Sequence, residues 1–143
     1  TEDEELRNKM LAKRENKIDK LINDDLNEAK YIGDEDIDYL IISWGSTFGP
    51  VQEALELLKK DNIKAGLLSF NDLWPLSTKK LNKWHEKEVE MIVVENNKSA
   101  QFARLIGSEL QIEINNKILK NSGRPFSGNE IYKRIKNEVI DNV

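Results

Sequence analysis

Short apolar runs alternate with amphipathic helical patterns from residue 38 to the end of the chain. The first run, Leu40 to Ile42, belongs to a strand predicted around Leu40 to Trp44. This strand leads into a turn spanning Gly45 to Gly49, and a helix is predicted to begin near Pro50. The buried face of this helix shows the expected three- and four-residue spacing at Val51, Ala54, Leu55 and Leu58. An unbroken apolar run is typical of a strand covered on both faces of a sheet, so this unit predicts an α/β protein.

The same unit recurs along the chain. Further strands are predicted at Ile63 to Phe70, Met91 to Glu95 and Lys117 to Lys120, each followed by a helix. Three serines are predicted to cap these helices at their N-termini, and they are Ser77, Ser99 and Ser127, the last in a capping box with Glu130. Strands that alternate with helices require a mainly parallel sheet with helices on both faces. The predicted fold is therefore a three-layer α/β/α domain.

The first 29 residues show a different pattern. From Glu2 to about Ala29 there is no proline or glycine, and apolar residues recur at helical spacing, which predicts one helix of up to about 24 residues. The stretch from Ala12 to Lys17 is polar and interrupts the apolar stripe. Two interpretations stay open: an amphipathic helix with one face on the domain, or a connector that packs on a neighbour. We divide the chain into a connector helix, 1–29, and an α/β domain, 30–143.

Composition narrows the function classes. The chain has 22 basic and 26 acidic residues, so no strong attraction to nucleic acid or to an anionic membrane is expected. It has no cysteine, which excludes disulfides, thiolate zinc sites, cysteine-ligated iron–sulfur clusters and a cysteine nucleophile in these 143 residues. No apolar stretch approaches the roughly 20 residues that span a bilayer, so we expect a cytoplasmic protein. Because the chain begins at Thr1, we also expect it to be part of a longer polypeptide.

Candidate chemistry gathers where strands end, since ligands of open α/β sheets bind outside the carboxyl ends of the strands. The turn residues Gly45, Ser46, Thr47 and Gly49 offer backbone N–H groups, two hydroxyls and a helix N-terminus to an anion. The turn has neither a third glycine nor a following lysine, so it completes no dinucleotide or P-loop motif. A purely structural turn is the favoured alternative.

No catalytic or metal-binding residue is predicted. His85, the one histidine, stands beside Trp84 among lysines and glutamates, a pattern typical of a solvated helix surface. Glu95 ends a strand and has the chemistry of a general base, although a carboxylate that holds the Asn96-Asn97 turn is the favoured interpretation.

Three stretches carry a family resemblance. They resemble the end of the α-subunit of 2-oxoacid:ferredoxin oxidoreductases, and they are WGSTFGPVQEALELLKKDNIKAGLLSFNDLWPLSTKKL, MIVVENNKSAQFARLI and ILKNSGRPFSGNEI. MLAKRENKIDKL in the leading helix resembles the segment that leads out of the pyrimidine-binding domain of that subunit. The resemblance covers nearly the whole chain.

The resemblance implies a transketolase C-terminal-like domain, with a five-stranded sheet whose one antiparallel strand is assigned to Tyr31-Ile32. It also implies a holoenzyme that oxidatively decarboxylates a 2-oxoacid to an acyl-CoA with thiamine diphosphate, magnesium and iron–sulfur clusters, and passes electrons to ferredoxin. None of these cofactors, nor coenzyme A, is expected to be bound by this chain itself. The implied partners are the rest of the α-subunit and a β-subunit.

The implied role of this domain is subunit assembly. Candidate interface residues are Trp74, Pro75, Arg124 and Phe126, because a Trp or Phe beside Arg is a common interface anchor. The alternative is that Trp74 and Phe126 are core residues. Two other function classes stay open: a free-standing α/β module that binds a small ligand or phosphate, and another thiamine enzyme such as a transketolase.

Overall fold

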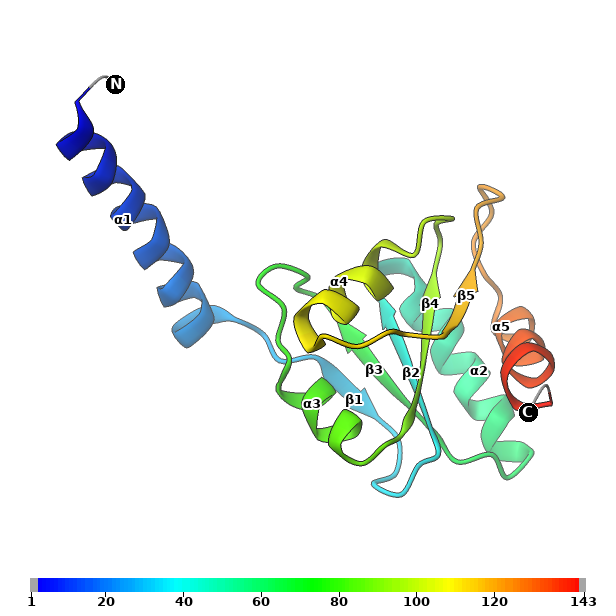
Figure 1. Cartoon of the computed structure of the whole chain (residues 1–143). Coiled ribbons are helices and arrows are strands. Elements are labelled where there is room, and N and C mark those ends of the chain that lie inside the picture. The colour runs from blue at the N-terminus through cyan, green and yellow to red at the C-terminus, as the bar shows by residue number, and fades with distance from the viewer. Residues whose placement is uncertain (1–2, 142–143) are drawn as a thin grey trace.

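A computed structural model describes residues 3–141 and contains one five-stranded sheet with flanking helices (Figure 1). Its elements, in chain order, are α1 (Glu4–Lys20), the π-helical segment η1 (Leu21–Asp25), β1 (Lys30–Ile32), β2 (Tyr39–Trp44), the 3-10 turn η2 (Gly45–Thr47), α2 (Phe48–Lys60), β3 (Ala65–Phe70), α3 (Lys79–Glu86), β4 (Glu90–Glu95), α4 (Gln101–Leu110), β5 (Asn116–Leu119), α5 (Gly128–Ile135) and the π-helical segment η3 (Lys136–Ile140). No helix in this part of the chain has the length and apolar character needed to cross a membrane.

The strands are ordered β1-β3-β2-β4-β5. β2 pairs in parallel with β3 and with β4, β4 pairs in parallel with β5, and only β1 runs antiparallel, along β3. The three-layer fold, the five strands and the antiparallel strand at Tyr31-Ile32 are thus confirmed. The connection from β2 to β3 lies on one face of the sheet, and the connection from β3 to β4 lies on the other face. The chain connections therefore diverge between the neighbouring strands β2 and β4.

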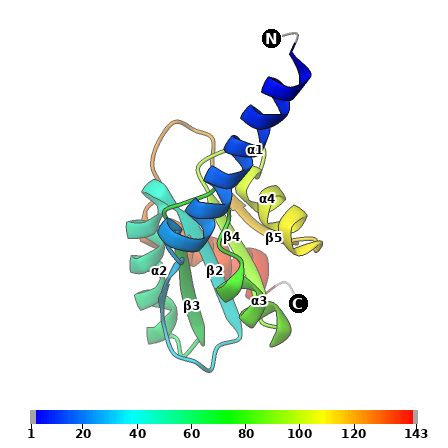
Figure 2. The same ribbon diagram turned by 90° about the vertical axis from the view of Figure 1, so that its left-hand side faces the viewer.

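Apolar side chains of consecutive strand residues point to opposite faces of the sheet and form two cores. Figure 2 shows α2 on one side of the sheet and α3 and α4 on the other. Ile41 packs with α2 and α5, whereas Leu40 and Ile42 pack with α3 and α4. This alternation explains why Leu40, Ile41 and Ile42 are all apolar, since both faces of the strand are buried.

The N-terminal helix lies away from the two cores (Figure 1). Asp3 caps α1 by accepting hydrogen bonds from the backbone N–H groups of Glu5 and Leu6, and η1 ends the helical region at Asp25. No residue of α1 or η1 is buried. The interpretation that one face of this helix packs on the domain is therefore wrong, and the predicted start at Glu2 lies outside the described residues.

The segment after η1 is tied to the domain. The side-chain and backbone N–H groups of Asn27 donate to Asp72 Oδ2, at 2.9 and 3.2 Å. Lys80 Nζ donates to the carbonyl oxygen of buried Ala29 at 2.6 Å. Residues 27–29 thus contact the loop after β3 and the start of α3, whereas the helix before them does not rest on the sheet.

Two of the predicted helix caps are corrected and one is confirmed. Ser127 caps α5, accepting from the Glu130 backbone N–H at 3.2 Å. The predicted capping box is wrong in its other half, because the Glu130 carboxylate binds Lys120 at 2.5 Å instead of returning to the Ser127 backbone. At α3 the capping position is Thr78, one residue later than the predicted Ser77, and no side chain caps it. Ser99 does not cap α4 either, because a buried carboxylate from the sheet takes that role.

Candidate functional site

The carboxyl ends of β2 and β4 meet where the connections of the sheet diverge, the position at which open α/β sheets bind ligands. Ser46 follows β2 and Asn96 follows β4, and Asn96 Nδ2 donates to Ser46 Oγ at 3.4 Å. These two residues line a cleft of about 460 Å³ together with Lys120, Asn121, Gly123, Arg124 and Pro125. The cleft therefore joins the predicted anion-binding turn to Arg124, which the sequence suggested for a different role.

The turn itself is built around Thr47. Its hydroxyl donates to the carbonyl oxygen of Trp44 at 2.8 Å and accepts from the Trp44 backbone N–H at 3.3 Å. Thr47 is buried, whereas Gly45, with φ of +56°, Ser46 and Gly49 are exposed. The prediction that the Thr47 hydroxyl faces an anion is wrong because that hydroxyl closes the turn, and Ser46 carries the available one.

Charge in the cleft comes from Lys120 and Arg124. Lys120 Nζ is already held by the Glu130 carboxylate at 2.5 Å and by the carbonyl oxygen of Pro125 at 3.0 Å. Within residues 3–141, Arg124 is exposed and has no ion-pair or hydrogen-bond partner. None of the residues that line the cleft is acidic. The free charge of the cleft is therefore the positive charge of Arg124.

Below the cleft, Glu95 is a fully buried carboxylate with structural partners. Its oxygens accept from the backbone N–H groups of Phe102 and Ala103, both at 2.9 Å, and from Asn97 Nδ2 at 2.6 Å. It caps the N-terminus of α4 from the end of β4, where a carboxylate also faces the positive end of the helix dipole. The prediction that Glu95 holds the following turn is confirmed, while the cap itself was missed. Because its three bonds are all internal, we assign Glu95 no role as a base.

The predicted interface residues differ in exposure. Trp74 is 68% exposed, and it precedes the half-buried Pro75 through a cis peptide bond. Phe126 is only 4% exposed and packs in the core between α2 and α5, with Lys120 Nζ 5.2 Å from its ring. Phe126 is therefore a core residue, and proposing it as an interface anchor was wrong. His85 is exposed on α3, which confirms its predicted surface position.

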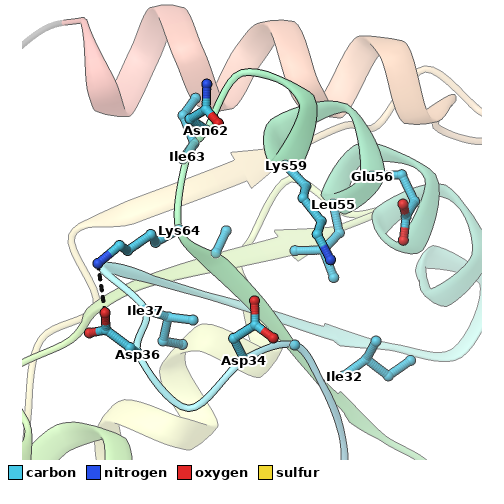
Figure 3. Close-up of a pocket in the computed structure, with 12 residues that line it drawn as sticks. Ile32, Asp34, Asp36, Ile37, Leu55, Glu56, Lys59, Asn62, Ile63 and Lys64 are labelled. Atoms are coloured by element: carbon cyan, nitrogen blue, oxygen red, sulfur yellow. Dashed lines mark hydrogen bonds and ion pairs between the residues drawn. The ribbon is translucent and has the colours of Figure 1, made fainter.

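A second cavity, of about 580 Å³, opens at the opposite edge of the sheet, where β2 and β3 begin. Figure 3 shows Lys59 of α2 and Asp34 of the loop after β1 directed into it, and Lys64 Nζ paired with Asp36 at 2.6 Å. The Lys64 ammonium hydrogen-bonds to Asp36 and lowers the pKa of that carboxyl. Because ligands of α/β sheets bind at the carboxyl edge, we place the candidate site at the Ser46 cleft rather than here.

Tyr31, on the antiparallel strand, provides a pH-dependent prediction. Burial, reinforced by the nearby carboxylates of Glu35 and Asp34, raises the pKa of Tyr31 from 10.0 to about 12. Folding thus favours the neutral phenol, so its stabilisation is complete below the unfolded pKa and is lost as pH rises from about 10 to 12. We expect an ultraviolet absorbance titration to show a phenol with a midpoint near 12, and Tyr31→Phe to abolish it.

Urea unfolding gives a second measurement. Between about pH 10 and 12, the free energy of unfolding of Tyr31→Phe should fall by less than that of the wild type. Tyr39, whose pKa is also raised by burial, stays in the variant and serves as the internal reference. Unchanged titration after Tyr31→Phe would contradict the assignment.

Within residues 3–141, no group of three or more histidine, cysteine, aspartate or glutamate side chains is placed to hold a metal ion. The donors at the cleft are hydroxyl, amide and guanidinium groups. Such a set suits an anion.

The chain matches the family model of the pyruvate:ferredoxin oxidoreductase core domain II over residues 37–137. It is 32% identical over 139 residues to 2-oxoacid:ferredoxin oxidoreductase 2, subunit alpha, of Aeropyrum pernix, covering 95% of this chain and 22% of that protein. It is also 32% identical over 135 residues to the 2-oxoacid:ferredoxin oxidoreductase subunit alpha of Saccharolobus solfataricus, covering 92% and 21%. The chain thus spans about a fifth of the length of these curated relatives.

Solved structures show the same similarity. A 2-oxoglutarate:ferredoxin oxidoreductase from Magnetococcus marinus, with 2-oxoglutarate, coenzyme A and succinyl-CoA bound, superposes with a TM-score of 0.80 at 28% identity, over 96% of this chain and 24% of that one. The alpha chain of a probable 2-oxoacid ferredoxin oxidoreductase from Thermoplasma acidophilum gives 0.56 at 35% identity, over 80% of this chain and 97% of that one. The three stretches that carried the resemblance all lie within the matched range.

Proposed function

This chain belongs to the pyruvate:ferredoxin oxidoreductase core domain II family, and from this premise we propose that it is a non-catalytic domain of a 2-oxoacid:ferredoxin oxidoreductase α-subunit that serves subunit assembly. Oxidative decarboxylation of a 2-oxoacid to an acyl-CoA, with electrons passed to ferredoxin, belongs in this proposal to the whole enzyme. The names of the relatives support that activity, and their greater length supports a site assembled with other domains.

The cofactors of the holoenzyme are assigned elsewhere in this proposal. A chain without cysteine has no thiolate with which to ligate an iron–sulfur cluster. The one fully buried carboxylate described above is committed to a helix cap. We therefore propose that thiamine diphosphate, magnesium and the clusters are held by the rest of the α-subunit and by a β-subunit.

The observation that carries the assembly role is the uncovered N-terminal helix. Large apolar side chains on α1 and η1 are each between 39% and 48% exposed, and they are Leu6, Met10, Leu11, Ile18, Leu21 and Ile22. In proteins, most of the stability of a helix comes from the packing of an apolar face against other elements. The polar stretch from Ala12 to Lys17 divides these side chains into two patches, an N-terminal and a C-terminal one.

We assign the cover of both patches to the rest of the α-subunit, because the relatives extend well beyond the length of this chain and burial of such patches stabilises an interface. Trp74 is the second proposed contact, since an exposed tryptophan is a frequent interface anchor. Within this proposal, residues 1–29 connect the α/β domain, residues 30–143, to its neighbour. The hydrogen bonds of Asn27 and Ala29 fasten the end of this connector to the domain.

Hydrogen exchange tests the assembly role. In this chain alone we expect the amides of α1 and η1 to exchange with little protection, because no tertiary contact covers them. In the full α-subunit with its β-subunit we expect their protection to rise by about 100-fold or more. Equal exchange in both samples would contradict the proposal.

Variants of the full enzyme sharpen this test. Ile18→Ser with Ile22→Ser, and separately Trp74→Ala, should weaken assembly by about tenfold or more, measured by sedimentation. The matched control is Lys13→Ala in the polar middle of α1, which should assemble as the wild type does. Circular dichroism of each variant checks that the α/β domain stays folded.

A further inference from the structure

We propose that the cleft lined by Ser46, Asn96 and Arg124 binds the phosphate group of a phosphorylated small molecule. The cleft lies at the carboxyl edge of the sheet, over the ends of β2, β4 and β5, and the chain connections diverge to opposite sides of the sheet between the first two of these strands. Loops after three neighbouring strands thus contribute to one cleft at the edge where open α/β sheets bind ligands. The position of the cleft in the fold is one argument for a ligand, and the chemistry of its side chains is a second, independent one.

The charge of the cleft selects an anion. Lys120 is neutralised by Glu130, so it adds little free charge. Arg124 has no carboxylate partner among residues 3–141, and no acidic side chain lines the cleft. The other cavity differs, since Asp34, Asp36 and Glu56 line it together with two lysines. Unlike that cavity, the Ser46 cleft presents a guanidinium without a competing carboxylate.

The donors of the cleft suit phosphate better than carboxylate. Ser46 Oγ accepts from Asn96, which leaves the Ser46 hydroxyl proton free to donate. The second amide hydrogen of Asn96 and the planar fork of Arg124 add further donors, and Asn121 lies on the same wall. A carboxylate has two oxygens to receive them, whereas a phosphate monoester has three terminal oxygens and carries more charge.

The size of the cleft leaves room for a ligand larger than a free ion. Its volume of about 460 Å³ greatly exceeds the roughly 30 Å³ that a water molecule occupies in the liquid. The cleft can therefore accommodate a phosphate group together with part of the molecule that carries it. Coenzyme A is a suitable probe because it carries both a phosphate monoester and a diphosphate, and the site proposal does not depend on the enzyme activity proposed above.

The test is a titration of this chain followed by nuclear magnetic resonance. The probes are inorganic phosphate, coenzyme A, dephospho-coenzyme A and acetate, and the signals are the Ser46 amide, the Asn96 side-chain amide and the Arg124 Nε–H. We expect coenzyme A and phosphate to shift these signals, and acetate at equal concentration to leave them unchanged. Weaker binding of dephospho-coenzyme A would identify the monoester as the bound group, and equal binding would identify the diphosphate. Both results support the site.

Variants separate this site from general electrostatics. Arg124→Gln should weaken coenzyme A binding by about tenfold or more, because it removes a charge-assisted donor. Lys98→Gln, which removes one positive charge from an exposed residue outside the cleft, is the matched control and should bind as the wild type does. Three results would overturn the proposal: no shift with any of the three phosphate-bearing probes, equal shifts with acetate, or equal weakening by Lys98→Gln. The assembly tests above change other residues, on the N-terminal helix and at Trp74, so either proposal can fail alone.

Discussion

Replacing Trp84 by alanine is expected to lower the free energy of unfolding by about 3–5 kcal/mol, the range for removal of a large buried aromatic side chain. Trp84 on α3 is 1% exposed, and its ring lies 5.0 Å from the ring of Tyr31. The ammonium groups of Lys83 and Lys87 lie 5.0 and 4.8 Å from it. The substitution opens a cavity between α3 and the antiparallel strand β1, and ends contacts of both lysines.

The measurement is urea unfolding at neutral pH, followed by the fluorescence of the remaining tryptophans. Trp74→Ala is the matched control, because Trp74 is 68% exposed and its loss should change stability by no more than about 0.5 kcal/mol. Similar losses for the two variants would contradict the described burial. The comparison also separates the two proposed roles of tryptophan in this chain, packing at Trp84 and assembly at Trp74.

Glu95→Ala is expected to lower the free energy of unfolding by about 3 kcal/mol or more, since charge-assisted hydrogen bonds contribute roughly 1.5–3 kcal/mol each. The substitution leaves the backbone N–H groups of Phe102 and Ala103 buried without an acceptor. Glu95→Gln retains one acceptor oxygen and should have a smaller effect. Thermal and urea unfolding of both variants measure this order.

Ser99→Ala is the control for this prediction. The sequence pattern placed the cap of α4 at Ser99, but Ser99 gives the helix no capping bond. We therefore expect Ser99→Ala to change stability by no more than about 0.5 kcal/mol. A large loss with Ser99→Ala and a small one with Glu95→Ala would reverse the assignment of the cap.

The fold could be predicted because its signals are local. Each of these signals depends only on residues close in sequence. Examples are the run Leu40–Ile42, the helical spacing from Val51 to Leu58 and the capping residue Ser127. The outcomes that sequence patterns missed depend on contacts between distant residues. Glu95 caps a helix by accepting from backbone N–H groups seven and eight residues further along the chain. Only the conformation of the Asn96–Ala100 loop brings these groups to the carboxylate.

The candidate site was predicted only in part, for the same reason. Ser46 was singled out by its turn, whereas Asn96 was named only as part of the turn that Glu95 holds. The contact between these two residues depends on the strand order of the sheet. Arg124 was singled out for its neighbours Pro125 and Phe126. Its place in the cleft could not be predicted, because Arg124 and Ser46 are 78 residues apart in sequence. The orientation of α1 could not be predicted from the spacing of its apolar residues. An exposed amphipathic helix and one that packs on its own domain have the same spacing.

The two outer strands have a consequence for aggregation. β1 spans only three residues and β5 only four, and each includes a lysine, Lys30 and Lys117. Short, charged edges discourage sheets of separate molecules from joining edge to edge, a common route to fibrils. A chain with such edges can expose the apolar side chains of α1 without also offering a sheet template. Unwanted self-association of this domain would then proceed through the helix, and solubility could be improved there without altering the sheet.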